Sequence, residues 1–286
     1  MSNNRVVMNR KFADLIENAG ISITEALKKS DLPEDLFNRQ ISSLTAVEYI
    51  RFMEALKELS IDECTPIKMG TLESVETFSP PVFAAYCSKN MLTCMKRIAT
   101  YKRLIGPLVF VINENMNDVT LEMSFENEEY EVPEFLIGAE MVFLVQLMRN
   151  ATKTHVVPKE VMTQHQIDHD HYESFFGIRP AAGPRNMLTI SKQDALRPFI
   201  SQNDAMWEYF EPELRRRLNE LDVDDTYAAR VRSALIELLP AGEGTIEDVS
   251  SKLGWSKRTL QRKLKEENTS FQKQLNHTRE LLARHI

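Results

Sequence analysis

The sequence has few of the features that mark secreted, membrane-spanning or disulfide-bonded proteins. Its 286 residues include only three cysteines, Cys64, Cys87 and Cys94, an odd number with no CxxC spacing. Such cysteines are typical of buried thiols in a reducing cytoplasm. No run of about 18 apolar residues offers a membrane span. The N-terminal residues 1–5 lack the apolar core of a signal peptide. We therefore expect a cytoplasmic protein.

The motifs of common catalytic and nucleotide-binding sites are also missing. The chain contains no GxGxxG, no GxxxxGK followed by Ser or Thr, no GxSxG and no HExxH. The acidic residues between 126 and 131 form a run on a connection rather than a paired carboxylate site. We therefore expect that the protein is not an enzyme and that it has no catalytic residues and no cofactor.

One cluster resembles a set of metal ligands, composed of His165, Asp168, His169, Asp170 and His171. His165 and His169 are four residues apart and would suit a metal if both lay on one helix. The run is also typical of a strand that passes into a helix, with Asp168 or Asp170 as the N-cap. We expect the cap rather than a metal site.

Charge is divided unevenly along the chain. The formal net charge is −7, but residues 245–286 contain nine Lys or Arg and five Asp or Glu, a net of +4. The first 244 residues therefore have a net charge of −11. Because contact with phosphates is driven by counterion release, only the C-terminal part is expected to meet nucleic acid.

A helix, a tight turn and a second helix are predicted over residues 245–265. Thr245 and Asp248 have the spacing of an N-terminal capping pair, Gly254 ends the first helix, and Ser256 caps the second. Apolar residues fall on one face of each helix: Ile246, Val249 and Leu253 on the first, Leu260 and Leu264 on the second.

The outer side of the second helix is polar and basic. Arg258, Gln261 and Arg262 are spaced i, i+3, i+4 and share one face. Arg and Gln side chains read guanine and adenine edges, so we expect these three residues to contact DNA bases. Ser256, Lys257 and Lys263 are expected to contact phosphates, and Trp255 either packs under the turn or lies against the DNA backbone. The alternative is a solvated basic helix on a bundle.

Residues 253–265, followed by Thr269-Ser270-Phe271 and by Thr278-Arg279, resemble the first half of the DNA-binding region of AraC/XylS-type transcriptional regulators. The resemblance extends over residues 227–286 and implies double-stranded DNA as a partner. Those regulators carry two helix-turn-helix units joined by a long helix. Here residues 270–286 resemble the joining helix, and the second unit does not follow. We therefore expect the chain to be cut short from a longer protein.

The first 221 residues predict an α+β domain. Residues 9–60 have helical periodicity, two helices follow at 82–87 and 90–105, and residues 108–113 and 119–125 have the pattern of a β-hairpin. The helix predicted from 133 to 148 is apolar nearly all round, which is typical of a buried helix. Shorter strands are expected at 161–167, 178–182 and 187–190, forming a small, mainly antiparallel sheet. A charged helix spans 204–221, and the polar segment 221–226 is expected to be a flexible hinge. The predicted domains are residues 1–221 and the all-α unit 227–286.

The first domain also resembles, more loosely, the effector domain of the ornithine- and arginine-responsive branch of AraC-type regulators. The residues that carry this resemblance are Gly70, Thr77-Phe78, Glu134, the stretch Tyr172 to Gly177, and Asn186-Met187-Leu188. It implies a small-molecule effector. Such pockets are mostly apolar with a few polar groups. The residues predicted to line one are Phe78, Phe83, Tyr86, Arg97, Tyr101 and Phe143, each of which also fits a place in the core or on the surface.

The sequence therefore predicts a DNA-binding transcriptional regulator whose N-terminal domain senses an effector. The resemblance further implies a homodimer and, for an activator, contact with RNA polymerase. The alternative is an acidic protein-interaction regulator that acts through a partner protein and whose shortened DNA-binding unit is silent.

Overall fold

The structure is a computed structural model that describes residues 6–8, 10–38, 42–72, 79–167, 170–224, 226–239 and 242–283. The chain forms two compact units, unit 1 over residues 1–215 and unit 2 over residues 216–286. Unit 1 combines helices with two small sheets, and the described part of unit 2 is helical. The predicted α+β class of the first domain is confirmed.

The N-terminal part of unit 1 is a helical layer joined by a two-stranded sheet. Strands β1 (Val6–Met8) and β2 (Ser42–Leu44) pair antiparallel, a sheet that the helical periodicity of residues 9–60 did not predict. The helices are α1 (Arg10–Asn18), α2 (Ile23–Lys29), the 3₁₀ turn η1 (Leu36–Asn38), α3 (Ala46–Leu59) and α4 (Thr65–Leu72). Thr45 and Glu48 cap each other's backbone at the start of α3, as expected for this spacing.

A five-stranded mixed sheet forms the centre of unit 1, with the strand order β3-β4-β7-β5-β6. The strands are β3 (Leu108–Glu114), β4 (Asp118–Phe125), β5 (Glu160–Thr163), β6 (Ala181–Ala182) and β7 (Asn186–Ser191). The β3–β4, β4–β7 and β7–β5 pairs are antiparallel, and β5–β6 is parallel. The predicted hairpin is therefore confirmed, and the sheet is mainly antiparallel as expected. Its turn is closed by Asn115, whose side-chain oxygen accepts from the amides of Asn117 and Asp118 at 2.8 Å each.

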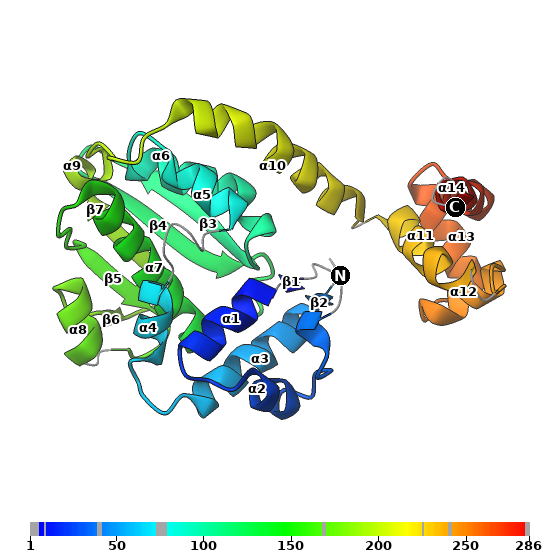
Figure 1. Ribbon diagram of the computed structural model, residues 1–286, viewed down its shortest axis with the longest axis horizontal. Helices are drawn as coiled ribbons and strands as arrows, with labels where there is room; N and C mark the ends of the chain where they lie inside the picture. The colour runs from blue at the N-terminus through cyan, green and yellow to red at the C-terminus, as the bar shows by residue number, and fades with distance from the viewer. Residues whose placement is uncertain are drawn as a thin grey trace. The chain divides into compact units, whose positions relative to one another are not determined.

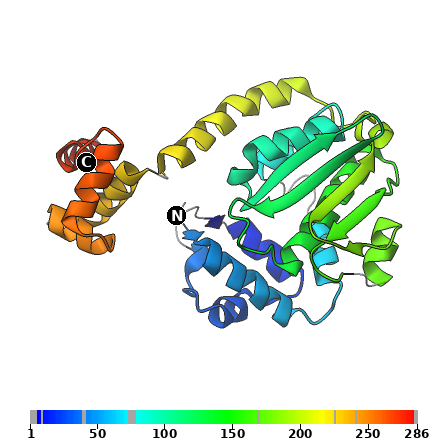
Figure 2. The same ribbon diagram turned by 180° about the vertical axis from the view of Figure 1, so that it is seen from behind.

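Helices cover one face of this sheet (Figure 1), and the view from behind shows the opposite face (Figure 2). The covering helices are α5 (Pro80–Tyr86), α6 (Met91–Tyr101) with the 3₁₀ turn η2 (Lys102–Leu104), and α7 (Glu134–Thr152). The predicted burial of α7 is confirmed, because its side chains from Ile137 to Met148 belong to the main hydrophobic core on nearly every side. On the opposite face, Val111 of β3 is 48% exposed.

Unit 1 ends with two short helices and one long one: α8 (Asp170–Phe176), α9 (Lys192–Ala195) and α10 (Asp204–Asp224). Helix α10 runs from unit 1 into unit 2, since the boundary between the units lies at Arg215–Arg216. It also continues through Leu221–Asp224, most of the segment expected to be a flexible hinge. These residues include no Gly or Pro to end the helix. Within the described residues, no helix is long and apolar enough to cross a membrane.

Unit 2 contains α11 (Tyr227–Leu238), α12 (Ile246–Lys252), α13 (Lys257–Glu266) and α14 (Phe271–Ala283). Their core is built from small and aliphatic side chains, with Val231, Leu235, Val249, Leu260 and Leu264 all fully buried. The Thr226 hydroxyl oxygen accepts from the amide of Ala229 and caps the start of α11.

Candidate nucleic-acid interface and ligand pocket

Helices α12 and α13 begin at side-chain caps and are separated by a sharp turn. Thr245 and Asp248 form a reciprocal capping box on α12, and the Ser256 hydroxyl accepts from the amide of Thr259 at 3.1 Å on α13. Gly254 between them has φ +65, a left-handed conformation that L side chains rarely adopt. The caps and the glycine therefore fix where one helix ends and the next begins.

The buried side of α13 fixes which residues face outward. Leu260 and Leu264 are four residues apart and fully buried against α11 and α12. With 3.6 residues per turn, positions three or four apart lie on the same face. Arg258, Gln261 and Arg262 therefore turn away from this core, and the structure leaves all three exposed. The Arg262 guanidinium also forms an ion pair with Glu266 one turn later, at 3.7 Å.

Lys265 belongs to the same outward surface, although sequence reasoning gave it no role. It is exposed and lies four residues after Gln261 and seven after Arg258. The i, i+3, i+7 spacing of Arg258, Gln261 and Lys265 was available in the sequence as a signal. We call Arg258, Gln261, Arg262 and Lys265 the basic face of α13.

The three residues predicted to contact phosphate each have a partner within unit 2. The Ser256 hydroxyl caps α13 and also lies 2.8 Å from the Thr259 hydroxyl. The Lys257 ammonium donates to Glu247 at 2.5 Å, and this bond holds the pKa of Glu247 below its usual value. The Lys263 ammonium lies over the ring of Tyr227, 3.8 Å from its centroid, and 5.0 Å from that of Trp255.

Three of the residues predicted to line an effector pocket lie against the start of α10. Arg97 of α6 lies 3.7 Å from the centroid of the Trp207 ring, and Tyr101 lies 6.1 Å from it. Phe83 of α5 meets Phe210 edge to face at 5.8 Å. These contacts bring three predicted pocket residues together at one helix.

The remaining predicted pocket residues are less informative. The Tyr86 ring packs against Phe199 at 6.3 Å, and Phe143 is half-buried against the main core of unit 1. Phe78 lies outside the described residues. Arg97 also donates to the Ser88 hydroxyl at 2.9 Å, and its burial lowers the pKa of its guanidinium. Whether these side chains bind an effector stays a prediction.

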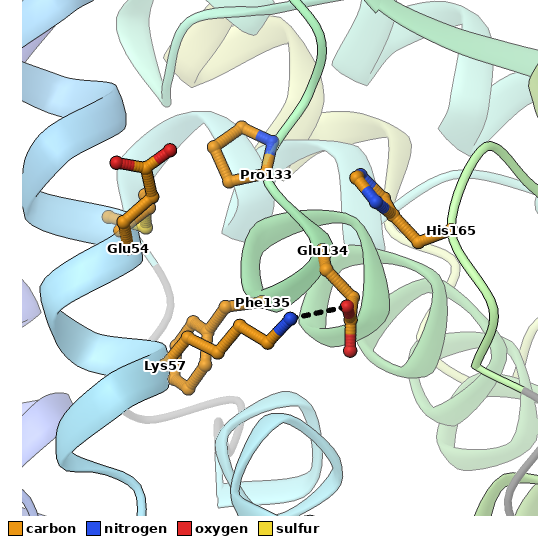
Figure 3. A pocket seen from close by; sticks show the side chains of 7 residues that line it. Glu54, Lys57, Pro133, Glu134, Phe135 and His165 are labelled. Atoms are coloured by element: carbon orange, nitrogen blue, oxygen red, sulfur yellow. Dashed lines mark hydrogen bonds and ion pairs between the residues drawn. The ribbon is translucent and has the colours of Figure 1, made fainter.

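A small pocket lies between α3 and the N-terminal end of α7 (Figure 3). Its volume is about 140 Å³, and its lining is Met53, Glu54, Lys57, Pro133, Glu134, Phe135 and His165. Figure 3 shows Lys57 meeting Glu134, at 2.6 Å, with Glu54 and His165 on opposite sides of the space. Ligand pockets typically measure about 300–1,000 Å³, so this one suits only a very small molecule. Sequence reasoning gave no sign of it, because its lining comes from three distant segments.

His165 has a structural partner in this pocket. Its Nε2 lies 2.6 Å from the carbonyl oxygen of Val132, which only accepts, so the proton is on Nε2. Its Nδ1 is 3.8 Å from the Glu131 carboxylate. Across the part of the chain that the structure describes, no three His, Cys, Asp or Glu side chains gather as metal ligands. Asp168 and His169 lie outside those residues.

Comparison with known proteins identifies the class of unit 1. Residues 20–199 match the family described as the arabinose-binding domain of AraC transcription regulators, N-terminal. The chain belongs to this family. The match covers more than half of the chain and confirms the resemblance to AraC-type regulators with an N-terminal effector domain. It ends at residue 199 and leaves unit 2 untested.

Comparisons with solved structures and with curated proteins add nothing to this family assignment. Among solved structures, the crystal structure of the transcriptional regulator CdpR from Pseudomonas aeruginosa aligns with 96% of this chain and 85% of that chain. The two are 15% identical, and the TM-score is 0.48. No curated protein matches the chain.

Proposed function

We propose that this AraC-type regulator binds double-stranded DNA through α12 and α13, which act as a helix-turn-helix. The observation that carries the proposal is the basic face of α13, in which four long polar side chains stand outward on a capped helix anchored by Leu260 and Leu264. Such a helix fits the major groove, where Arg and Gln pair with guanine and adenine edges. Arg258, Gln261 and Arg262 are the proposed base contacts.

Ser256 and Lys257 are the proposed phosphate contacts at the start of α13. Helix N-termini favour anions, and Ser256 is the N-cap. Lys257 would exchange the carboxylate of Glu247 for a phosphate oxygen, a swap of one exposed anionic partner for another. Because exposed ion pairs are weak, this exchange does not oppose DNA binding strongly.

The test is a comparison of Arg262→Ala on two DNAs, a duplex selected from a random-sequence pool by the wild-type chain and an unselected duplex. Loss of one bidentate base contact should cost about 1–3 kcal/mol on the selected duplex, or about 5- to 150-fold in Kd. The unselected duplex should lose much less. Lys273→Ala, an exposed cation on α14, is the matched control and should affect both duplexes alike. An equal loss of affinity on both duplexes for Arg262→Ala would refute the assignment of Arg262 as a base contact.

We also propose that unit 1 binds a small-molecule effector and that α10 transmits its effect. Supporting this, Phe83, Arg97 and Tyr101 hold the start of α10, and α10 continues into unit 2. A ligand that competes with Trp207 for these side chains would release the helix. Coupling of this kind is typically about 1–3 kcal/mol and acts equally in both directions.

This second proposal is tested by thermal-shift screening of a panel of small metabolites. A true effector should raise the unfolding midpoint of the wild-type chain and change its affinity for DNA. Arg97→Gln should remove both effects, whereas Arg179→Gln, an exposed arginine on unit 1, should keep them. An effector whose binding survives Arg97→Gln unchanged would place its site elsewhere in unit 1.

A further inference from the structure

Lys263 differs from the other lysines of α13 because its ammonium lies over two aromatic rings. It is 3.8 Å from the centroid of Tyr227 and 5.0 Å from that of Trp255. The two rings meet edge to face, with centroids 5.7 Å apart and planes at 79°. A cation within about 6 Å of an aromatic face is attracted by the negative charge density of the ring. Lys263 is therefore already bound within unit 2.

The same corner ties three segments of unit 2 together. Tyr227 is the first residue of α11, Trp255 follows the turn that ends α12, and Lys263 lies on α13. Glu267, just after α13, accepts from the amides of Tyr227 and Ala228 at 2.6 and 2.8 Å. Because a helix N-terminus leaves its first amides without partners in the helix, this carboxylate satisfies two of them. The cation and the carboxylate thus fix α13 against the start of α11.

Lys265 lies on the other side of α13. It is exposed on the basic face, whereas Lys263 is half-buried next to Leu264 and turned toward α11. Two lysines only two residues apart therefore point to different surroundings, as residues about 200° apart around a helix must. The outward lysine is exposed to solvent, where its ammonium can neutralise a phosphate and release the counterions condensed on the DNA.

We infer that Lys265 contacts the DNA phosphates and that Lys263 is a positioning residue, which holds the base-reading helix through the Tyr227–Trp255 pair. The inference rests on the proposed DNA binding, and it moves the phosphate contact expected of Lys263 to Lys265. It also explains why Trp255 is half-buried beside the turn, packed on Tyr227.

Lys263→Gln and Lys265→Gln in the full chain provide a matched pair, since each removes one positive charge from the same helix. Affinity for a mixed-sequence duplex is measured across a range of KCl concentrations. Lys265→Gln should make the slope of log K against log [KCl] less negative by about 0.9, the value for one phosphate contact. Lys263→Gln should leave the slope at the wild-type value, although overall affinity falls because α13 is less well held.

A second readout reports on the aromatic corner directly. The indole N–H resonance of Trp255, assigned through Trp255→Phe, should shift in Lys263→Gln and stay in place in Lys265→Gln. Lys263→Arg keeps a cation over the rings and should restore both the resonance and the affinity. If Lys263→Gln fails to fold, the comparison is made between Lys263→Arg, which keeps the cation over the rings, and Tyr227→Leu, which removes one of the rings.

The outcomes separate the inference from the function on which it rests. A slope made less negative to the same extent by both substitutions, with an unmoved Trp255 resonance, overturns the assignment of Lys263. An unchanged slope in Lys265→Gln overturns the assignment of Lys265. A wild-type chain that binds no duplex refutes the proposed DNA binding, while the resonance and its rescue by arginine still decide whether Lys263 positions α13.

Discussion

At the scale of single residues, close packing in unit 1 depends on positions where no side chain fits. At Gly70 of α4, an added Cβ would lie 2.7 Å from the carbonyl oxygen of Ala139 and 2.7 Å from the nearest Val142 methyl carbon on α7. Real Cβ atoms are not found so close to backbone oxygens. The two helices therefore approach at a distance that only glycine permits.

We predict that Gly70→Ala destabilises unit 1 by a net of about 1–2 kcal/mol, because the overpacking exceeds the gain in helix propensity. Gly106→Ala is the control, since no atom lies within 4 Å of its added Cβ, and it should stay within about 0.5 kcal/mol of wild type. Urea unfolding curves give both values. Similar stability for the two variants would show that α4 can move away from α7 at little cost.

Tyr49 gives a second prediction at this scale. Burial, and then the negative charge of Glu140, raise the pKa of the Tyr49 hydroxyl above its usual 10.0. A raised pKa means that the folded chain keeps a proton that the unfolded chain releases. The associated stability is complete below about pH 10 and is lost as pH rises further toward the folded-state pKa.

Between about pH 10 and 11, the free energy of unfolding should therefore fall less steeply in Tyr49→Phe than in wild type. The expected difference is about 1 kcal/mol over this pH unit, measured by urea titrations at each pH. Tyr209→Phe, whose ring is 77% exposed, should keep the wild-type slope. Parallel curves for wild type and Tyr49→Phe would contradict the raised pKa.

At the scale of elements, α10 is the helix whose packing against α5 and α6 could not be predicted from the sequence. Its residues read as a charged surface helix, yet Trp207 and Phe210 pack on α5 and α6. Three side chains predicted to hold an effector supply that packing surface. An aromatic residue in the sequence fits a pocket, a core or a helix contact equally well, and only the fold decides among them.

Trp207→Ala should loosen this contact. Loss of the Arg97 and Tyr101 contacts is expected to remove about 1–2 kcal/mol, so amides near residue 207 should exchange with deuterium about 5- to 30-fold faster. Glu208→Ala, at an exposed position next to Trp207, should leave exchange unchanged. Equal acceleration in both variants would mean that α10 frays for reasons unrelated to Arg97.

At the scale of the whole molecule, the chain consists of two compact units with opposite charge character. Residues 245–286 have a net charge of +4, and the preceding 244 residues have a net charge of −11. Each unit has its own hydrophobic core, with Leu260 and Leu264 in unit 2 and the sheet and α7 in unit 1. Separate cores allow the units to unfold separately.

Calorimetry of the full chain should accordingly show two transitions. Gly70→Ala should lower the midpoint of one transition only. Thr245→Ala, which removes the capping box of α12, should lower only the other, by about 1 kcal/mol or about 4–8 °C for a unit of this size. A single transition shifted by both variants would show that the two units unfold as one.

The sequence alone determined the features that depend on near neighbours along the chain. The capping boxes at Thr45 and Thr245, the hairpin of β3 and β4 and the burial of α7 were all predictable. Caps, turns and periodicity act over a few residues. The face of α13 formed by Arg258, Gln261 and Arg262 was predictable for the same reason, since helical spacing fixes which side chains lie together.

Only the tertiary structure decided matters that depend on distant segments. Three such features join residues far apart in sequence. They are the pairing of β1 with β2, the contact of Trp207 in α10 with Arg97, and the pocket between α3 and α7. Lys263 and Lys265 have the same chemistry and nearly the same position in the chain. The placement of Tyr227, which follows from the packing of α11 on α13, gives one lysine an aromatic partner and leaves the other in water.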